Sequence, residues 1–374
     1  MELFNFINDN GGYVHPGIER KRGKNGIYGI FTKQKIKKEE ILFNIPKKLT
    51  INIDTNKIPE NLKLKGNLFL KVYNLLLEKR KGEKSKFKIQ LSLYPSLEDL
   101  KETEWAFFEN EVHDAINKTI SYYFPPKDKL KKMISIMDPI KDSFTYEEIL
   151  YALLIVLRYS WKEALVPGIE LMNHKSFSNV MMKRNKGKKF FYYKNFADLD
   201  KNEEVFDSYG IKSIKSLLFG YGFFDPNNDN FITLSYSLTS SNPFDFQKSK
   251  LLEKFGFIMN LVTKNGKSFI KTQSTTEALL ISKNRIHKKS NEILKILCAE
   301  NEHELKELNP LKFLKFVRRL CKLNLDNINF EELRNLESKL PSKYFYIVEA
   351  IKERVNILKN KIKECNILLN SLIK

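Results

Sequence analysis

The sequence of 374 residues has few cysteines, and none of them are close enough in the chain to suggest a shared metal ion. Cys298, Cys321 and Cys365 lie far apart in the last quarter, without a CxxC pair. This spacing gives no support for a zinc cluster or a disulfide framework. We therefore expect a protein without a metal site that resides in a reducing compartment.

Long apolar runs are also missing. The most apolar run, Ile149 to Leu157, is about half of the ~20 residues that a membrane-spanning helix requires. The first residues, MELFNFINDN, carry acidic side chains and lack a basic segment followed by an apolar core, so they do not look like a secretory signal. We expect no membrane partner and a cytoplasmic location, with a nuclear location left open.

Acidic residues are fewer than basic ones. The sequence has 45 aspartates and glutamates and 65 lysines and arginines, which gives a net charge of +20. Such a balance raises the possibility of a nucleic-acid-binding protein, whose binding would depend steeply on salt. The lysines are spread along the whole chain, however, and the block from Lys183 to Lys189 is short and interrupted by Gly187. This pattern favours a solvated basic surface, and we expect no nucleic-acid partner.

What is present is the composition of a globular protein, with 42% hydrophobic and 29% charged residues. The length suffices for two domains. The first fifty residues predict short strands, because apolar and β-branched runs of strand length occur at Ile27 to Thr32, Ile41 to Ile45 and Leu49 to Ile53. Helical spacing begins near Gly66 and continues to about Trp161.

Short strands are expected again between Val166 and Thr233, and from there to the C-terminus the pattern is almost wholly helical. The last predicted helix has an apolar stripe with steps of three and four residues. The stripe consists of Ile351, Val355, Leu358, Ile362, Cys365, Leu369 and Leu372. It indicates packing inside a helical domain rather than an intermolecular coiled coil, which would require more heptads. The layout predicts an α+β protein followed by an all-α domain, and we expect a monomer.

Three segments carry residues of chemical interest. The first, Asn25 to Pro46, begins with a glycine-containing turn before a strand. The second, Leu165 to Val180, is apolar until it places Asn173 beside His174. The third, from Glu203 onward, contains Tyr209-Gly210 and then the aromatic stretch Gly220-Tyr-Gly-Phe-Phe224. Each segment alone is common in structural roles, and only their order and spacing point to a site.

In that order the segments resemble the SET-domain methyltransferases, in the branch that includes the Rubisco large-subunit lysine methyltransferase. The resemblance implies a SET-domain fold of short β-sheets over residues 1–235, with a helical insertion at about 60–160. It also implies an all-α substrate-binding domain over 236–374. The lack of a cysteine-rich cluster after the SET region agrees with this branch.

The resemblance implies that the backbone of Gly26, Ile27, Tyr28 and Gly29 contacts S-adenosylmethionine. In the family this turn usually reads x-G-x-G, and here Ile27 stands where the first glycine is usual.

Four further residues match cofactor contacts of the family. The Asn173-His174 pair corresponds to an Asn-His pair that holds the cofactor, and Glu170 stands where the branch more often has Asp. Arg158 matches a basic residue that pairs with the methionine carboxylate, which suits a guanidinium. The alternative for Arg158 is a helix-end cation favoured by the helix dipole.

Tyr209 matches the family's active-site tyrosine, which also contacts the cofactor, while Tyr221 and Phe223 match aromatic residues that line the channel for the target side chain. The implied activity is transfer of a methyl group to a lysine of a non-histone protein. Two alternatives keep the fold: a histidine acceptor, as in the actin-type enzyme of this branch, and an inactive SET-like binding module.

Overall fold

The structure is a computed structural model that describes residues 1–24, 26–53, 58–63, 65–120, 128–161, 164–175, 178–184, 190–227, 230–234, 236–240, 243–253, 255, 257–264, 267–274, 279–282 and 285–373. The chain forms two compact units. The first contains residues 1–108 and 125–210, and the second contains residues 109–124 and 211–374.

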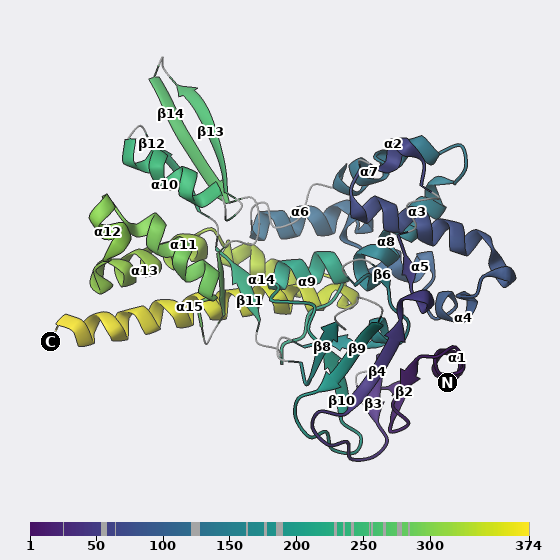
Figure 1. Cartoon of the computed structure of the whole chain (residues 1–374). Coiled ribbons are helices and arrows are strands. Elements are labelled where there is room, and N and C mark those ends of the chain that lie inside the picture. The colour runs from purple at the N-terminus through teal and green to yellow at the C-terminus, as the bar shows by residue number, and fades with distance from the viewer. Residues whose placement is uncertain are drawn as a thin grey trace. The chain divides into compact units, whose positions relative to one another are not determined.

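The first unit holds two four-stranded sheets, ordered β1-β4-β9-β8 and β2-β3-β10-β7, and the strand pair β5-β6 (Figure 1). Its strands are β1 (Tyr13–Val14), β2 (Ile18–Arg22), β3 (Tyr28–Thr32), β4 (Ile41–Pro46), β5 (Ile51–Asn52), β6 (Ala164–Leu165), β7 (Asn173–His174), β8 (Val180–Arg184), β9 (Phe190–Asn195) and β10 (Glu204–Asp207). Most pairs are antiparallel, but β7 runs parallel to β10. The strands expected near residues 27–32, 41–45 and 49–53 are confirmed.

A helical region separates β5 from β6 in the sequence, and most of it belongs to the first unit. Its helices there are α2 (Glu60–Lys63), α3 (Asn67–Arg80), α4 (Lys88–Leu91), α5 (Leu97–Thr103), α7 (Asp128–Ser135) and α8 (Tyr146–Tyr159). Helix α8 begins with a capping box in which Thr145 and Glu148 exchange side-chain to backbone hydrogen bonds. Its residues Ile149 to Val156 are all buried, so the apolar run noted in the sequence forms the centre of this helical core.

The sheets of the first unit enclose a second apolar core, which includes Phe43, Tyr193 and Val205. Helix α1 (Glu2–Asp9) contributes Leu3, Phe4 and Ile7 to it. The sequence reading predicted only strands in the first fifty residues and was wrong for this helix. The helix has only two turns. Its three apolar residues, at i, i+1 and i+4, form too short a pattern to distinguish a helix from other structures in the sequence alone.

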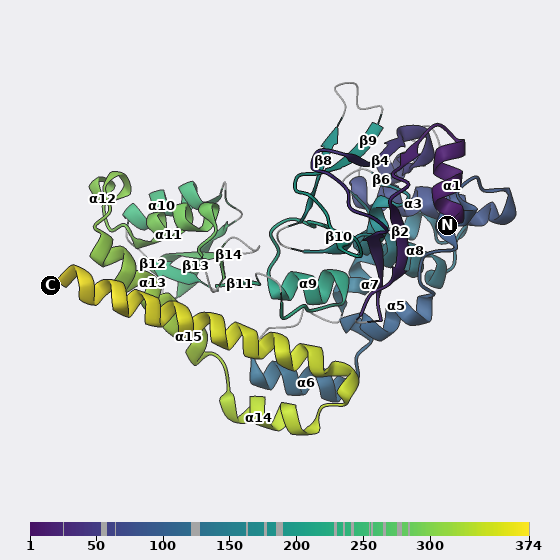
Figure 2. The ribbon, with the colours of Figure 1, turned by 90° about the horizontal axis from the view of Figure 1, so that it is seen from below.

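The second unit is built around two long helices that pack together, α13 (Pro310–Asp326) and α15 (Phe345–Ile373). The shorter helices are α6 (Asn110–Thr119), α9 (Ile214–Tyr221), α10 (Pro243–Glu253), α11 (Lys288–Cys298), α12 (Glu302–Lys306) and α14 (Phe330–Lys339). Figure 2 shows α6 alongside α14 and α15, and α6 contacts α14. The α15 stripe is largely buried within the unit at Ile351, Leu358 and Cys365, which confirms that it packs in a core.

Two features of the second unit differ from the sequence prediction. Residues 211–235 belong to it, since β11 (Phe231–Thr233) pairs with β15 (Leu280–Ser282), so the units divide at 210/211 rather than at 235/236. The region after residue 236 is not all-α, because β12 (Ser237–Ser240), β14 (Lys267–Ser274) and β13 (Phe257–Lys264) form an antiparallel sheet.

The β13–β14 hairpin has a sequence signal that the helical reading overlooked. Its pairing ends at Lys264 opposite Lys267. The dipeptide between them in the sequence is Asn-Gly, which lies outside the described residues and is the strongest short-range signal for a hairpin. The run FIMNLVT before it is also rich in residues that favour strands.

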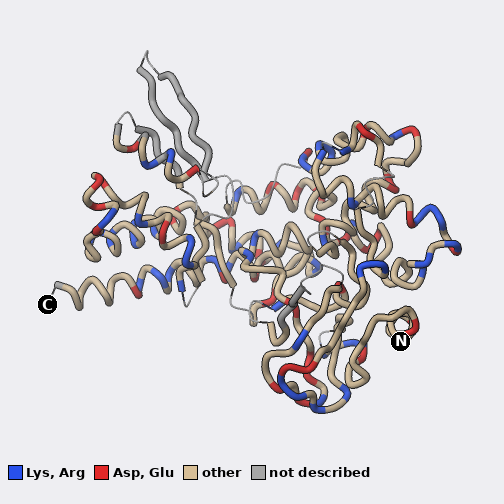
Figure 3. Tube along the Cα trace, in the orientation of Figure 1, with Lys and Arg blue, Asp and Glu red and all other residues tan. Residues whose placement is uncertain are grey.

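Basic and acidic residues are interspersed along the elements of both units, as the coloured trace of Figure 3 shows. The excess of lysine and arginine is thus distributed over the elements, as the sequence suggested. None of the helices in the described part of the chain combines the length and the apolar composition that a membrane span requires.

Packing in the core of α8 can be tested with Leu153→Ala. Leu153 is fully buried, so the substitution leaves a cavity that we expect to lower the free energy of unfolding by roughly 2–5 kcal/mol. Chemical denaturation followed by circular dichroism measures the change. Leu323→Ala, in a helix but half-exposed, is the control with an expected cost below about 1 kcal/mol. Equal losses in the two variants would contradict the described packing.

Candidate active site

Three strands of one sheet bring the candidate residues together. In the order β3-β10-β7, Val205 lies opposite Ile30, and Phe206 and Asp207 lie opposite Asn173 and His174. Segments that are far apart in the sequence therefore become neighbours at one end of the sheet. All the predicted residues up to Tyr209 belong to the first unit, although Asn25, at the start of the first segment, lies outside the described residues.

Gly29 allows β3 to lie close to Asn173 and Glu204. A Cβ atom at position 29 would stand 2.4 Å from Glu204 Oε1 and 2.9 Å from Asn173 Nδ2, so any side chain there would have to displace these two groups. Asn173 Nδ2 donates to the backbone oxygen of Tyr28 at 3.1 Å and to Glu204 Oε1 at 2.7 Å. The glycine, the asparagine and the carboxylate therefore form one fixed arrangement. Glu204 was not among the predicted site residues.

His174 and Tyr209 form a second contact across the same sheet end. The backbone N–H of Tyr209 donates to His174 Nδ1 at 3.1 Å, and the two rings have their centroids 5.0 Å apart. His174 is buried. Because Nδ1 accepts this bond, a neutral His174 carries its proton on Nε2. The hydroxyl of Tyr209 donates to the backbone oxygen of Met172 at 2.9 Å, which fixes the phenol beside the Asn-His pair.

Asp207 is a second residue that the sequence reading missed. It lies opposite His174 in the β7–β10 pair and is buried. It accepts a hydrogen bond from Tyr193 Oη at 3.3 Å and one from the Ser208 backbone at 2.8 Å. Burial raises the pKa of Asp207 to about 6. A signal for Asp207 was present in the sequence. The exposure of β10 alternates, and Asp207 is an acidic residue on the same buried face as Val205.

Glu170 lies in a hydrogen-bonded cluster with residues of the helical insertion. It accepts from Gln90 Nε2 at 2.8 Å and from Tyr94 Oη at 3.0 Å. The ring of Tyr94 lies 5.3 Å from that of Tyr159, between centroids. Burial raises the pKa of Glu170 to about 8, so this carboxyl is largely protonated at neutral pH. The structure thus gives Glu170 a role in joining the β6–β7 connection to α4, and its predicted cofactor contact stays a prediction.

Arg158, like Glu170, was predicted to contact the cofactor and forms bonds within the protein. Its guanidinium donates to Thr103 Oγ1 at 2.7 Å and to Glu104 Oε2 at 3.3 Å, and both members of this ion pair are largely buried. Burial raises the pKa of Glu104 to about 7, against the opposing pull of Arg158. These bonds attach the end of α8 to the last residue of α5 and to the residue that follows it. They fit a structural role at the helix end, and the contact of Arg158 with a carboxylate ligand stays a prediction.

The turn before β3 presents exposed residues. Ile27 is 54% exposed and Tyr28 is 46% exposed, and Gly26 has a φ of +79° that favours glycine. The guanidinium carbon of Arg20 lies 4.2 Å from the centre of the Tyr28 ring. Tyr28 thus holds a cation at the same sheet end that carries Asn173.

Tyr221 and Phe223 lie in the second unit. Tyr221 ends α9, Gly222 follows with a left-handed φ of +77°, and the rings of Tyr221 and Phe223 are 6.4 Å apart between centroids in an edge-to-face contact. They form an aromatic pair, and the channel that they were predicted to line stays a prediction.

The arrangement in the first unit can hold a polar ligand against a strand edge. It offers the exposed residues Gly26, Ile27 and Tyr28, an asparagine and a histidine in fixed orientations, and a phenol. Among the residues that the structure describes, no group of three or more His, Cys, Asp or Glu side chains is placed to bind a metal ion.

Comparison with known proteins agrees with this geometry. The family model described as the SET domain matches residues 27–210. A structure of the SET domain of LSMT bound to lysine and AdoHcy is 17% identical with a TM-score of 0.61, covering 98% of this chain and 90% of its own. A structure of Rubisco LSMT bound to AdoMet is 19% identical with a TM-score of 0.57, covering 99% and 92%. At such identities the likeness establishes a shared fold. No curated protein matches the sequence.

The protonated state of Glu170 predicts a pH-dependent stability. Its pKa is about 8 in the folded chain against an ordinary 4.5. The folded state therefore binds more protons than the unfolded state between these values, and stability falls as pH rises through that window. Glu170→Gln keeps an acceptor oxygen and loses the charge. We expect its melting temperature to fall less than that of the unmodified chain between pH 6 and pH 9, measured by differential scanning fluorimetry.

Glu147→Gln, at an exposed position of α8, is the matched control and should follow the unmodified chain at every pH. A Glu170→Gln variant that melts lower by the same amount at all pH values would contradict a buried neutral carboxyl.

Proposed function

We propose that this chain, which contains a SET domain over residues 27–210, is an S-adenosylmethionine-dependent methyltransferase that modifies a lysine side chain of a protein. One observation carries the proposal: Tyr209 binds both the ring of His174 and the carbonyl of Met172, while Asn173 is fixed against Tyr28 and Gly29. Residues at which the resemblance implied the donor site (Gly29, Asn173 and His174) therefore lie in one connected arrangement with the implied catalytic phenol of Tyr209.

The residues present fit the cofactor. A side chain at position 29 would displace Glu204 and Asn173, so the glycine keeps β3 close to Asn173, while Ile27 and Tyr28 beside it are exposed. His174 and Asn173 offer the polar groups that an adenosine and an amino-acid moiety require, and they would hold the cofactor together with the turn before β3. Structures of LSMT with AdoHcy and with AdoMet support this assignment by analogy of fold.

S-adenosylmethionine supplies a methyl group on a positively charged sulfur, which a neutral amine can take by direct displacement. The protein has to hold the acceptor lysine in its neutral form, although the amine ordinarily has a pKa near 10.4. A half-buried position beside the ring of Tyr209 favours the neutral amine, because desolvation disfavours the ammonium. The Tyr209 hydroxyl and the Met172 carbonyl, which accepts a hydrogen bond from it, can then orient the amine by hydrogen bonds.

The structural neighbours inform the identity of the acceptor. Structures of LSMT contain lysine, methyllysine or monomethyllysine, which supports a lysine acceptor. We propose a non-histone protein as the substrate. A histidine acceptor and an inactive binding module are the alternatives. Incubation with labelled cofactor and cell extract, followed by mass spectrometry of the modified residue, distinguishes the three. The expectations of a monomer, a cytoplasmic location and no nucleic-acid partner stay predictions.

Cofactor binding can be tested by thermal stabilisation. A ligand at 100 times its Kd stabilises the folded state by about 2.7 kcal/mol, which raises Tm by several degrees. We expect this shift with S-adenosylmethionine for the unmodified chain and a clearly smaller one for Asn173→Ala. Asn366→Ala, an exposed change on α15, should retain the full shift. An unchanged thermal shift with S-adenosylmethionine in Asn173→Ala would contradict a role of Asn173 in binding the cofactor.

The role of the Tyr209 hydroxyl in turnover can be tested separately from cofactor binding. Tyr209→Phe removes the hydroxyl but keeps the backbone N–H that binds His174. We expect kcat to fall by about 100-fold or more, while the thermal shift with the cofactor is retained. Tyr146→Phe, at a half-exposed tyrosine, is the control for the loss of a hydroxyl. Equal losses in turnover and cofactor binding would contradict a role at the reacting centre.

A further inference from the structure

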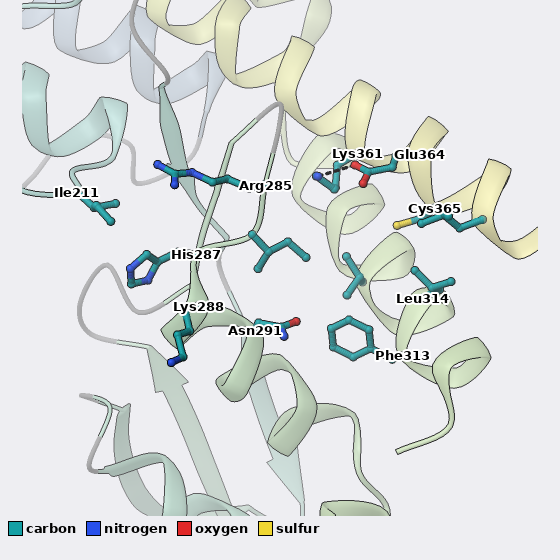
Figure 4. Close-up of a pocket in the computed structure, with 13 residues that line it drawn as sticks. Ile211, Arg285, His287, Lys288, Asn291, Phe313, Leu314, Lys361, Glu364 and Cys365 are labelled. Carbon is teal, nitrogen blue, oxygen red and sulfur yellow. Dashed lines mark hydrogen bonds and ion pairs between the residues drawn. The ribbon is translucent and has the colours of Figure 1, made fainter. Parts of the chain in front are cut away.

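The second unit contains a groove that the proposed catalytic site does not use. It has a volume of about 660 Å³ and is formed by the start of α11, by α13 and by α15 (Figure 4). We call it the α11 groove. Its lining residues are Ile211, Arg285, Ile286, His287, Lys288, Asn291, Phe313, Leu314, Val317, Lys361, Glu364, Cys365 and Leu368.

One side of the α11 groove is cationic. Figure 4 shows Arg285, His287 and Lys288 in succession along it, and both Arg285 and Lys288 are exposed. Burial and the charges of Arg285 and Lys289 lower the pKa of His287, which indicates a positive potential there. The acidic lining residue, Glu364, contacts Lys361, so these two charges offset each other.

The start of α11 adds to this potential. His287 is the N-cap residue and makes no side-chain bond to the helix, and the first turn holds no acidic residue. The positive end of the helix dipole is therefore not balanced by the side chains of that turn, and Lys288 and Asn291 line the groove at the same place. An anion in the groove would meet two cationic side chains and a helix N-terminus.

The other side of the α11 groove is apolar. Phe313 and Leu314 come from α13, and Cys365 and Leu368 come from α15. Leu368 is 42% exposed and Ile211 is 39% exposed, so apolar surface continues to the rim. An enclosed pocket would suit a small molecule, whereas an apolar rim open to solvent suits a chain segment that passes over it.

We propose that the α11 groove binds an acidic segment of the protein substrate, with an apolar side chain between α13 and α15 and carboxylates toward Arg285, Lys288 and the start of α11. This inference rests on the proposed function in that it assumes a protein substrate. It places a recognition site for that substrate in the second unit and gives the chemistry of the recognised segment. Charge complementarity and the apolar rim together select this occupant.

The probe is a fluorescein-labelled peptide of glutamate, leucine and serine, titrated with the full chain and followed by fluorescence anisotropy. We expect saturable binding that weakens with added salt. Binding should also weaken when the leucines of the probe are replaced by serine, and disappear when its glutamates are replaced by lysine. Neither the cofactor nor turnover is needed, so a failure here is distinguishable from a failure of the methyltransferase proposal.

Lys288→Glu is the main variant, since it reverses a charge in the groove. It also places an acidic residue in the first turn of α11, which the helix dipole favours, so the variant should fold well. Arg285→Gln is the second variant, and Leu368→Ser tests the apolar side. We expect each to weaken peptide binding about tenfold. Lys306→Glu and Lys339→Glu, exposed positions outside the groove lining, are matched controls and should bind within about twofold.

Equal weakening by the groove and control variants would mean that the general positive charge of the chain attracts the peptide, and would overturn the proposal. Absence of peptide binding would also overturn it. Octanoate is the probe for a small organic anion. If it binds with the same dependence on Lys288 and Leu368 while the peptide does not, the groove is a small-molecule site instead.

Discussion

The pairing of β7 with β10 is the interaction on which the candidate site depends. Only two residues, Asn173 and His174, run parallel to Phe206 and Asp207. Because the register of a strand fixes which side chains share a face, this short pairing sets His174 beside the backbone of Tyr209 and Asn173 beside β3. A shift by one residue would reverse both orientations. The hydrogen bonds from Asn173 to Tyr28 and Glu204 help to prevent such a shift.

Three carboxyl groups of the first unit lie in environments that disfavour their charge. Burial raises the pKa of Asp207 to about 6, of Glu104 to about 7 and of Glu170 to about 8. In the case of Glu104, desolvation outweighs the guanidinium of Arg158 at 3.3 Å. Glu170, which is largely protonated at neutral pH, positions Gln90 and Tyr94 through hydrogen bonds without adding a full negative charge.

The sequence was informative where patterns were long or distinctive. The apolar run of α8 and the stripe of α15 predicted helices that the structure confirms, and the order of the three segments pointed to a SET fold. Glu204 and Asp207 were missed because their roles arise only when β10 pairs with β3 and β7, and strands of two to four residues carry too little periodicity to reveal partners. The roles of Arg158 and Glu170 in bonding Glu104 and Gln90 depend on long-range packing in the same way. The strands after residue 236 were missed although Asn265-Gly266 was a recognisable signal.

The assignment of α6 to the second unit has a consequence for how the chain matures. Val112 and Ile116 of α6 are buried, and α6 contacts α14, while the Thr119 carbonyl accepts from the Asn329 backbone. Between Thr119 and Phe330 lie 210 residues, counting 120 to 329. At a synthesis rate of about 5–20 residues per second, the ribosome needs roughly 10–40 s to make these residues. During that time the apolar face of α6 lacks its partner helix α14. A nascent chain arrested before α14 would expose that face, and chaperones would find their binding site there.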